Sequence, residues 1–243
     1  MPAPIDKLDA TAEPLLPAPL LEALARRFST PSPLQSAYWS RCLAPPPPAR
    51  GRCRSRRHAV LTAPTGSGKT VCFLVPAIAA LLAEAEDSGG LVNQDPHSLL
   101  PAALPGQPRI VVVAPTRELA VQVHREALEL TAPATSAPCD GVHDGLGEAG
   151  TPASREPGRE PGRELLQPPL REGWLSAACL YGGVPPYHQV RLLEKGVHLL
   201  AATPGRLQDL LGQGRLRLDA TSTLVLDEYD RLLSGPLRSQ VEP

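Results

Sequence analysis

The sequence has few cysteines, and they follow no recognisable pattern. There are five, an odd number, and no two of them form a C-x-x-C pair. This spacing excludes the common zinc-binding signatures and a disulfide framework, so we expect a protein of a reducing compartment inside the cell. The cysteines are Cys42, Cys53, Cys72, Cys139 and Cys179.

Long apolar runs and an excess of positive charge are also lacking. No stretch reaches the roughly 18 apolar residues of a membrane span, and Asp6, Asp9 and Glu13 do not suit a secretory or organellar presequence. We therefore expect no membrane partner and a cytosolic or nuclear location. With 24 Lys+Arg against 25 Asp+Glu, the formal net charge is −1, which excludes a globally basic nucleic-acid binder. Any contact with nucleic acid would have to come from a local surface.

Proline and glycine, by contrast, are abundant and concentrated in three stretches. The 30 Pro and 20 Gly remove much of the length from any packed core, which leaves about one domain. A flank at 1–27 with a short helix precedes this domain, which we expect to span 28–243. The three stretches are a Pro/Arg-rich loop at 44–57, a polar loop at 86–108, and an insertion at 131–173 whose repeated Arg-Glu-Pro-Gly units predict disorder.

Short apolar runs alternate with helical patterns along the rest of the chain. The run at 110–114 is β-branched and fully apolar, which indicates a parallel strand buried on both faces. The alternation predicts an α/β fold, a doubly wound parallel sheet with helices on both faces and ligands at the carboxyl ends of its strands. Strands are expected at 59–62, 110–114, 177–181, 197–201 and 223–226, and helices at 18–27, 35–42, 69–85, 116–130, 186–195 and 204–212.

A glycine-rich loop between the first strand and its helix predicts a triphosphate site. Its backbone N–H groups can surround a polyphosphate at the positive end of the helix dipole. Lys69 would contact the β and γ phosphates, and the hydroxyl of Thr70 would bind Mg²⁺. Ala63 stands where the general pattern G-x-x-x-x-G-K-[ST] begins with glycine. The loop reads Ala63-Pro64-Thr65-Gly66-Ser67-Gly68-Lys69-Thr70.

The last predicted strand ends in two acidic residues, Asp227 and Glu228. A nucleoside triphosphatase needs an acid to hold the metal and a group to position the attacking water. We therefore assign Asp227 to Mg²⁺, bound through water, and Glu228 to the nucleophilic water. A P-loop enzyme of another class, such as a small-molecule kinase, stays open at this point.

Six motifs in one order resemble those of the DEAD-box RNA helicases. They lie between residues 28 and 233. The segments Pro115-Thr116-Arg117-Glu118-Leu119-Ala120 and Thr203-Pro204-Gly205-Arg206 are far more specific than a phosphate loop alone. The other four are Phe28 to Gln35, Ala63 to Thr70, Gly182-Gly183 and Asp227-Glu228-Tyr229-Asp230.

The resemblance implies a RecA-like domain of an ATP-dependent RNA helicase, an enzyme that couples ATP hydrolysis to remodelling of RNA duplexes or RNA–protein particles. ATP and Mg²⁺ are the implied cofactors, with Gln35 reading the adenine edge and no small-molecule substrate besides ATP and water. The RNA partner is held by its sugar-phosphate backbone and not by its bases. The implied RNA-binding residues are Pro115, Thr116, Arg117, Gly182, Gly183, Thr203, Pro204, Gly205 and Arg206.

Two departures from the family pattern refine these expectations. Tyr229 stands where the family name has Ala, and residues 1–27 contain no aromatic ring to stack on adenine, so nucleotide affinity should be weak. Asp227-Glu228-Tyr229-Asp230, called motif II in the family, and the following Arg231-Leu232-Leu233 resemble a subgroup that assembles the large ribosomal subunit. This resemblance favours the nucleus or nucleolus over the cytoplasm, and pre-ribosomal particles as partners. The basic run at 50–57 is either a nuclear localisation signal, an accessory RNA contact or a solvated loop.

The family's second RecA-like domain has no counterpart in this sequence. Because that domain supplies arginine fingers, which are worth roughly 10³–10⁵ in turnover, we expect residues 1–243 alone to bind ATP–Mg²⁺ weakly, hydrolyse it very slowly and unwind no duplex. The alternative is that the short chain acts as a nucleotide-sensitive RNA-binding or competing module.

Overall fold

Four parallel strands form the centre of the protein, shown by a computed structural model that describes residues 16–43, 58–64, 66–87, 99–132 and 174–241. The sheet has the order β2-β3-β1-β4, and every neighbouring pair is parallel. This confirms the α/β class. The predicted loop at 44–57 and residues 133–173 of the predicted insertion lie outside the described residues. The strands are β1 (Ile110–Val113), β2 (Ala177–Leu180), β3 (Leu199–Ala202) and β4 (Thr223–Leu226).

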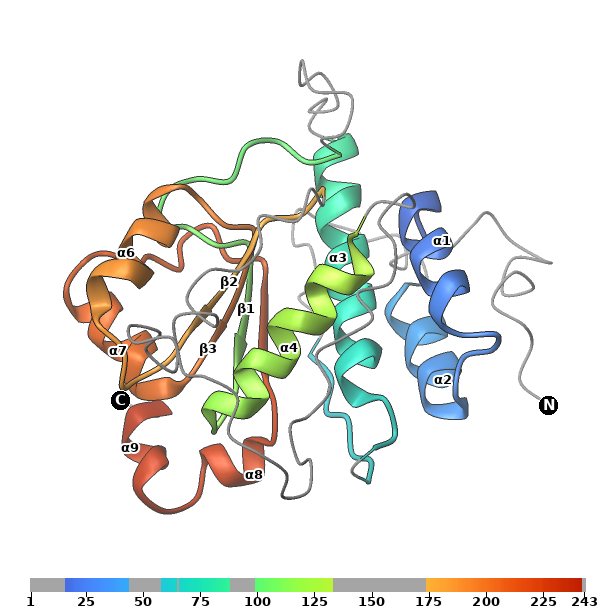
Figure 1. The fold of residues 1–243 in the computed structure, drawn as a ribbon. Coiled ribbons are helices and arrows are strands. Elements are labelled where there is room, and N and C mark those ends of the chain that lie inside the picture. The colour runs from blue at the N-terminus through green and yellow to red at the C-terminus, as the bar shows by residue number, and fades with distance from the viewer. Residues whose placement is uncertain (1–15, 44–57, 65, 88–98, 133–173, 242–243) are drawn as a thin grey trace, which may run out of the picture.

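Helices connect these strands and cover the sheet (Figure 1). The observed bounds agree with the predicted ones to within two residues, which is the usual uncertainty of a helix or strand end. The second helix begins at Pro33 instead of Gln35, because Ser32 caps its amino end and proline fits the first helical turn. The helices are α1 (Ala18–Arg27), α2 (Pro33–Cys42), α3 (Lys69–Asp87), α4 (Arg117–Leu130), α6 (Pro186–Glu194), α7 (Pro204–Gly212), α8 (Tyr229–Leu232), the 3-10 helix η2 (Gly235–Leu237) and α9 (Arg238–Val241).

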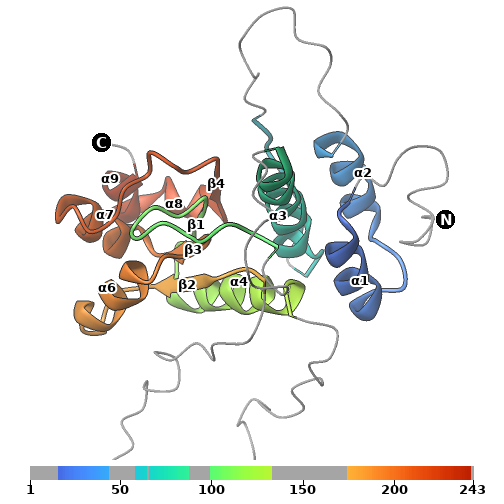
Figure 2. The same cartoon turned by 90° about the horizontal axis from the view of Figure 1, so that it is seen from above.

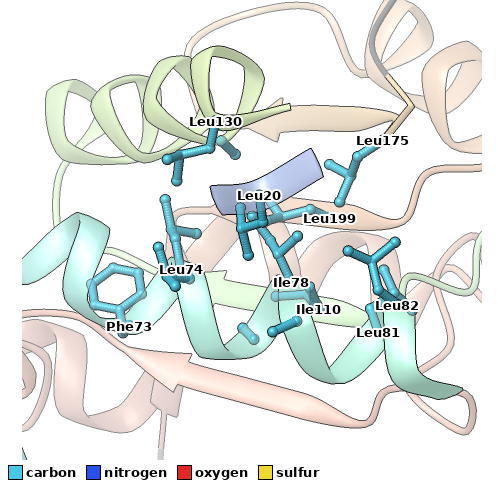
Figure 3. Close-up of a cluster of buried hydrophobic side chains, with 14 of the residues drawn as sticks. Leu20, Phe73, Leu74, Ile78, Leu81, Leu82, Ile110, Leu130, Leu175 and Leu199 are labelled. Atoms are coloured by element: carbon cyan, nitrogen blue, oxygen red, sulfur yellow. The ribbon is translucent and has the colours of Figure 1, made fainter. Parts of the chain in front are cut away.

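Each face of the sheet packs against its own set of helices. Along β1, Ile110 and Val112 join one apolar cluster, and Val111 and Val113 join the other. The first cluster includes residues of α1, α3 and α4, as Figure 3 shows, and the second includes residues of α6 and α7. The fully apolar run at 110–113 is therefore buried on both faces, as predicted. Seen from above, α1 and α2 lie outside α3 (Figure 2).

The long helix α3 contains Pro76, whose ring nitrogen has no hydrogen to donate. The carbonyl of Cys72, one turn earlier, consequently lacks its usual helical partner. The indole Nε1–H of Trp39 donates to this carbonyl at 3.0 Å. Trp39 is 1% exposed, so this bond joins α2 to α3 inside the core. No described helix, α3 included, combines the length and apolar character needed to cross a membrane.

One predicted strand is wrong. Residues 58–64 form neither helix nor strand, and Val60 is 79% exposed. A short apolar run becomes a strand only when a neighbouring strand pairs with it, and this long-range pairing is not encoded in the run itself. Within the described residues, β4 consequently has a strand neighbour on one side only, and Leu224 on it is 57% exposed.

Candidate nucleotide and RNA site

The described part of the glycine-rich loop leads directly into α3, as predicted. Thr65 lies outside the described residues. Gly66 and Gly68 have φ of +78° and +77°, the left-handed region in which glycine is favoured. A Cβ on Gly68 would lie 2.8 Å from Nε2 of Gln35, so a larger residue would displace the Gln35 side chain from the loop. No atom lies within 4 Å of the corresponding position on Gly66, which leaves that side of the loop open.

Lys69 holds the loop together through two hydrogen bonds to backbone carbonyls. Its ammonium donates to the carbonyl oxygens of Ala63 at 2.6 Å and Pro64 at 3.2 Å. The hydroxyl of Ser67 also donates to the Pro64 carbonyl, at 2.8 Å. Thr70, in the first turn of α3, is half-buried. These donors are the groups that a phosphate would take over from the carbonyls.

Asp227 at the end of β4 belongs to the same site. Its backbone N–H donates to the carbonyl of Val113 at 2.9 Å, which extends the pairing of β4 with β1. Burial raises the pKa of its carboxyl, and the Glu228 carboxylate acts in the same direction. The Glu228 N–H, which donates to Asp227 Oδ1 at 3.0 Å, and the charge of Lys69 lower that pKa. Lys69 is therefore near enough for its charge to act on the Asp227 carboxyl, while its ammonium donates to the loop carbonyls.

Glu228 adopts a strained backbone. Its φ of 47° and ψ of 51° are left-handed, and among the described residues other than glycine it alone has a positive φ. Such conformations cost on the order of 1–3 kcal/mol and concentrate at functional sites. The carboxylate accepts from Arg231 Nη1 at 2.8 Å, and Tyr229 beside it is half exposed. The Arg231 contact was not predicted; its only sequence signal is the i, i+3 spacing of opposite charges.

The raised pKa of Asp227 leads to a stability prediction. Folding favours the neutral carboxyl, while above its ordinary pKa of 3.8 the unfolded chain holds the charged form. Ionised Asp227 therefore destabilises the fold at neutral pH, and this cost disappears as the pH falls toward 3.8. We expect Asp227→Asn to raise the free energy of unfolding at pH 7 and to lose this advantage near pH 4, measured by urea denaturation. A variant less stable than the parent at pH 7 would contradict the prediction.

Gln35 connects α2 to the loop. Its Oε1 accepts from the Ser32 N–H at 2.8 Å, while the Ser32 hydroxyl accepts from the Gln35 N–H, so the two form a capping box. Its Nε2 donates to the Gly68 carbonyl at 3.5 Å, and the residue is 5% exposed. The amide keeps a second donor and a second acceptor. The adenine-reading role stays a prediction, and the link to the loop is a role that the spacing alone did not indicate.

The predicted RNA-binding motifs meet at the turn between β2 and α6. The Arg117 guanidinium lies 5.3 Å from the centre of the Tyr181 ring, and a Cβ on Gly183 would come within 3.0 Å of Arg117 Nη2. Arg206 Nη2 donates to the carbonyl of Val184 at 2.8 Å. Three distant motifs therefore converge, and the turn itself is exposed at Gly182 and Gly183.

The remaining predicted residues occupy the starts of two helices. Thr116 caps α4, accepting from the Leu119 N–H at 3.3 Å, and Pro115 precedes it. Thr203 precedes α7, and its N–H donates to the Leu180 carbonyl at 3.0 Å. Pro204 begins that helix and Gly205 follows. All of these positions follow the carboxyl ends of β1 and β3, the edge of the sheet at which ligands are predicted to bind.

The known proteins that are similar to this chain share one family description. The family model described as DEAD/DEAH box helicase matches residues 34–150 and 164–242. DEAD-box ATP-dependent RNA helicase 14 of Arabidopsis thaliana is 32% identical over 241 residues, which are 99% of this chain and 28% of that protein. ATP-dependent RNA helicase dbp2 of Sclerotinia sclerotiorum is 30% identical over 242 residues, which are 99% of this chain and 30% of that protein.

Among solved structures, the yeast DEAD-box splicing factor Prp28 is similar to this chain with a TM-score of 0.60 and 24% identity. The similarity covers 93% of this chain and 39% of that one, and it supports the RecA-like fold. The chain thus spans less than a third of the length of the two helicases named above. Because the family model covers most of the sequence, the chain belongs to the DEAD/DEAH box helicase family.

Proposed function

We propose that the chain is the ATP-binding portion of an ATP-dependent RNA helicase that couples ATP hydrolysis to remodelling of RNA. The observation that carries the proposal is the glycine loop with left-handed Gly66 and Gly68, which leads into α3 at Lys69, together with Asp227 directly after the end of β4. A lysine after a glycine loop can bind the phosphates of a triphosphate, and a carboxylate at a strand end can hold its metal ion. The family relationship supports ATP as the nucleotide.

The residues present fit ATP with Mg²⁺. Gly66 leaves room for phosphate oxygens near the backbone, and Lys69 supplies a donor that is held by two carbonyls. The Thr70 hydroxyl would ligate Mg²⁺ directly, and the Asp227 carboxylate would hold it through water. When bound, Mg²⁺ offsets the negative charge of the phosphate oxygens.

Glu228 would accept a proton from the attacking water. Its carboxylate accepts from Arg231 Nη1 at 2.8 Å, and its backbone N–H donates to Oδ1 of Asp227 at 3.0 Å. One carboxylate oxygen binds the arginine, which leaves the other for the water. Arg117, Gly183 and Arg206 would grip the RNA backbone around the exposed turn, since arginine side chains and backbone N–H groups suit phosphate oxygens.

The test is RNA-stimulated ATP turnover and duplex unwinding by the full-length polypeptide that the natural transcript encodes. We expect ATP turnover that rises when single-stranded RNA is added, and much slower turnover by residues 1–243 alone. Full-length protein that binds RNA but hydrolyses no ATP would contradict the proposal and favour a nucleotide-sensitive RNA-binding module. Unchanged preference for adenine in Gln35→Ala would favour a P-loop enzyme of another class.

A pre-ribosomal particle is the RNA–protein partner that we propose, with a nuclear or nucleolar location. Support comes from the sequence of motif II, in which Tyr229 replaces Ala and Arg231 follows. Sedimentation of the tagged protein with pre-ribosomal particles would support this partner, and its recovery only in free fractions would contradict it.

A further inference from the structure

We propose that the outward face of α6 is a base-stacking site for single-stranded RNA. The site, which we name the α6 platform, consists of Tyr187, His188 and Arg191. It extends the backbone-gripping surface of the proposed function, on which it rests, by a contact to the bases themselves.

The orientation of α6 is fixed from its inner face. Gln189 and Leu193 are 1% exposed, and Gln189 Nε2 donates to the carbonyl of Tyr181 at 3.0 Å. With 3.6 residues per turn, positions 187, 188 and 191 fall on the side opposite these two. All three are exposed in the structure. The buried glutamine therefore determines which way the platform points.

The platform is preorganised by contacts among its members. Tyr187, 57% exposed, has its ring centre 4.5 Å from that of His188, with the two planes tilted by 56°. Arg191 lies one turn further, with Cζ 5.8 Å from the Tyr187 ring and Nη1 donating to the Tyr187 hydroxyl at 3.1 Å. A phenol held at its hydroxyl end exposes its ring without free rotation, which lowers the entropy lost on binding.

An exposed ring beside a cation matches the chemistry of single-stranded nucleic acid. Bases stack on aromatic side chains, and arginine either binds a phosphate or stacks on a base. Within the described residues Arg191 has no acidic partner, so its charge is available to a phosphate. An i, i+4 Tyr–Arg pair also stabilises a helix slightly, by about 0.2–0.5 kcal/mol, but that role does not require exposed rings on both Tyr187 and His188.

Continuity with the motif surface favours RNA over a protein partner. The turn before α6 carries Gly183, which faces Arg117, and Val184, whose carbonyl is bound by Arg206. Tyr187 follows Gly183 by four residues. RNA gripped at that turn would therefore pass close to the platform. The rest of the exposed face carries Glu194 and Lys195, which provide little of the apolar area that a stable protein interface buries.

The experiment compares two RNAs of equal length on the whole chain. One is a single-stranded oligoadenylate, and the other carries abasic sites, so that it keeps the phosphates and lacks the bases. We expect Tyr187→Ala to weaken binding of the oligoadenylate about tenfold and to leave binding of the abasic RNA unchanged. Tyr187→Phe, which keeps the ring, should bind oligoadenylate like the parent. Leu104→Ala, in a loop outside α6 and 55% exposed, is the control for loss of an exposed apolar side chain.

A second readout concerns the charge of Arg191. If this side chain neutralises one phosphate, Arg191→Gln should reduce the slope of log affinity against log salt by about 0.7 on single strands. Parent-like oligoadenylate binding by Tyr187→Ala would overturn the α6 platform and leave the proposed function standing. The occupant of the exposed face of α6 to test next would then be a protein. Failure of the parent chain to bind any RNA would overturn both.

Discussion

Lys69→Ala is expected to weaken the affinity of the chain for ATP at least about 30-fold. Truncating one member of a desolvated, hydrogen-bonded charge pair costs about 2–5 kcal/mol, and the ammonium is the cation that the loop offers to the phosphates. The ammonium binds the carbonyls of Ala63, which is half-buried, and Pro64, which is exposed. Water can bind these carbonyls in the variant, so the fold should remain intact. Calorimetric titration with ATP and Mg²⁺ measures the effect.

The matched control is Lys195→Ala, which removes an exposed lysine just after α6. The control should bind ATP like the parent. Equal affinities for the parent and Lys69→Ala would show that the triphosphate binds elsewhere, and the nucleotide site proposed here would then be wrong.

Trp39→Ala is expected to destabilise the fold by about 3–5 kcal/mol, the usual cost of truncating a large buried aromatic side chain. Such a loss is a large fraction of the 5–15 kcal/mol by which domains are typically stable. The variant leaves a cavity between α2 and α3, and it leaves the Cys72 carbonyl without a donor because Pro76 cannot supply one. Urea denaturation measures the free energy of unfolding.

Trp39→Phe separates the two causes. Phenylalanine fills much of the space but has no N–H. We therefore expect its free energy of unfolding to be lower than that of the parent by about 1–3 kcal/mol, the cost of an unsatisfied buried carbonyl. A phenylalanine variant as unstable as the alanine variant would show that packing volume is the minor factor. A parent-like phenylalanine variant would show that the hydrogen bond to α3 contributes nothing.

Local patterns predicted most of the regular elements because each pattern coincides with a long-range contact. The run at 223–226 and the segment at 204–212 match β4 and α7 in both bounds. The run at 59–62 has the same apolar character as β4 but does not pair, so its strand was predicted in error. A four-residue run does not contain the information about its partner.

The sequence predicted which residues form the site, but it did not predict the contacts among them. The motifs predicted the roles of Lys69 and Asp227, but the position of Asp227 depends on β4 lying beside β1 in the sheet. The left-handed backbone of Glu228 had no sequence signal, since glutamate carries none of the usual preference for that region. Gln189, whose amide holds the turn before α6, was likewise missed because a glutamine inside a helix usually faces solvent.

The bond between Trp39 and the Cys72 carbonyl has an optical consequence. The chain contains two tryptophans, and this one contacts the first turn of α3, three residues after Lys69. Indole emission responds to the hydrogen bond that its N–H makes. In a Trp174→Phe background, Trp39 becomes a single built-in fluorophore, and its spectrum reports any shift of the helix that leaves the phosphate loop without an added dye.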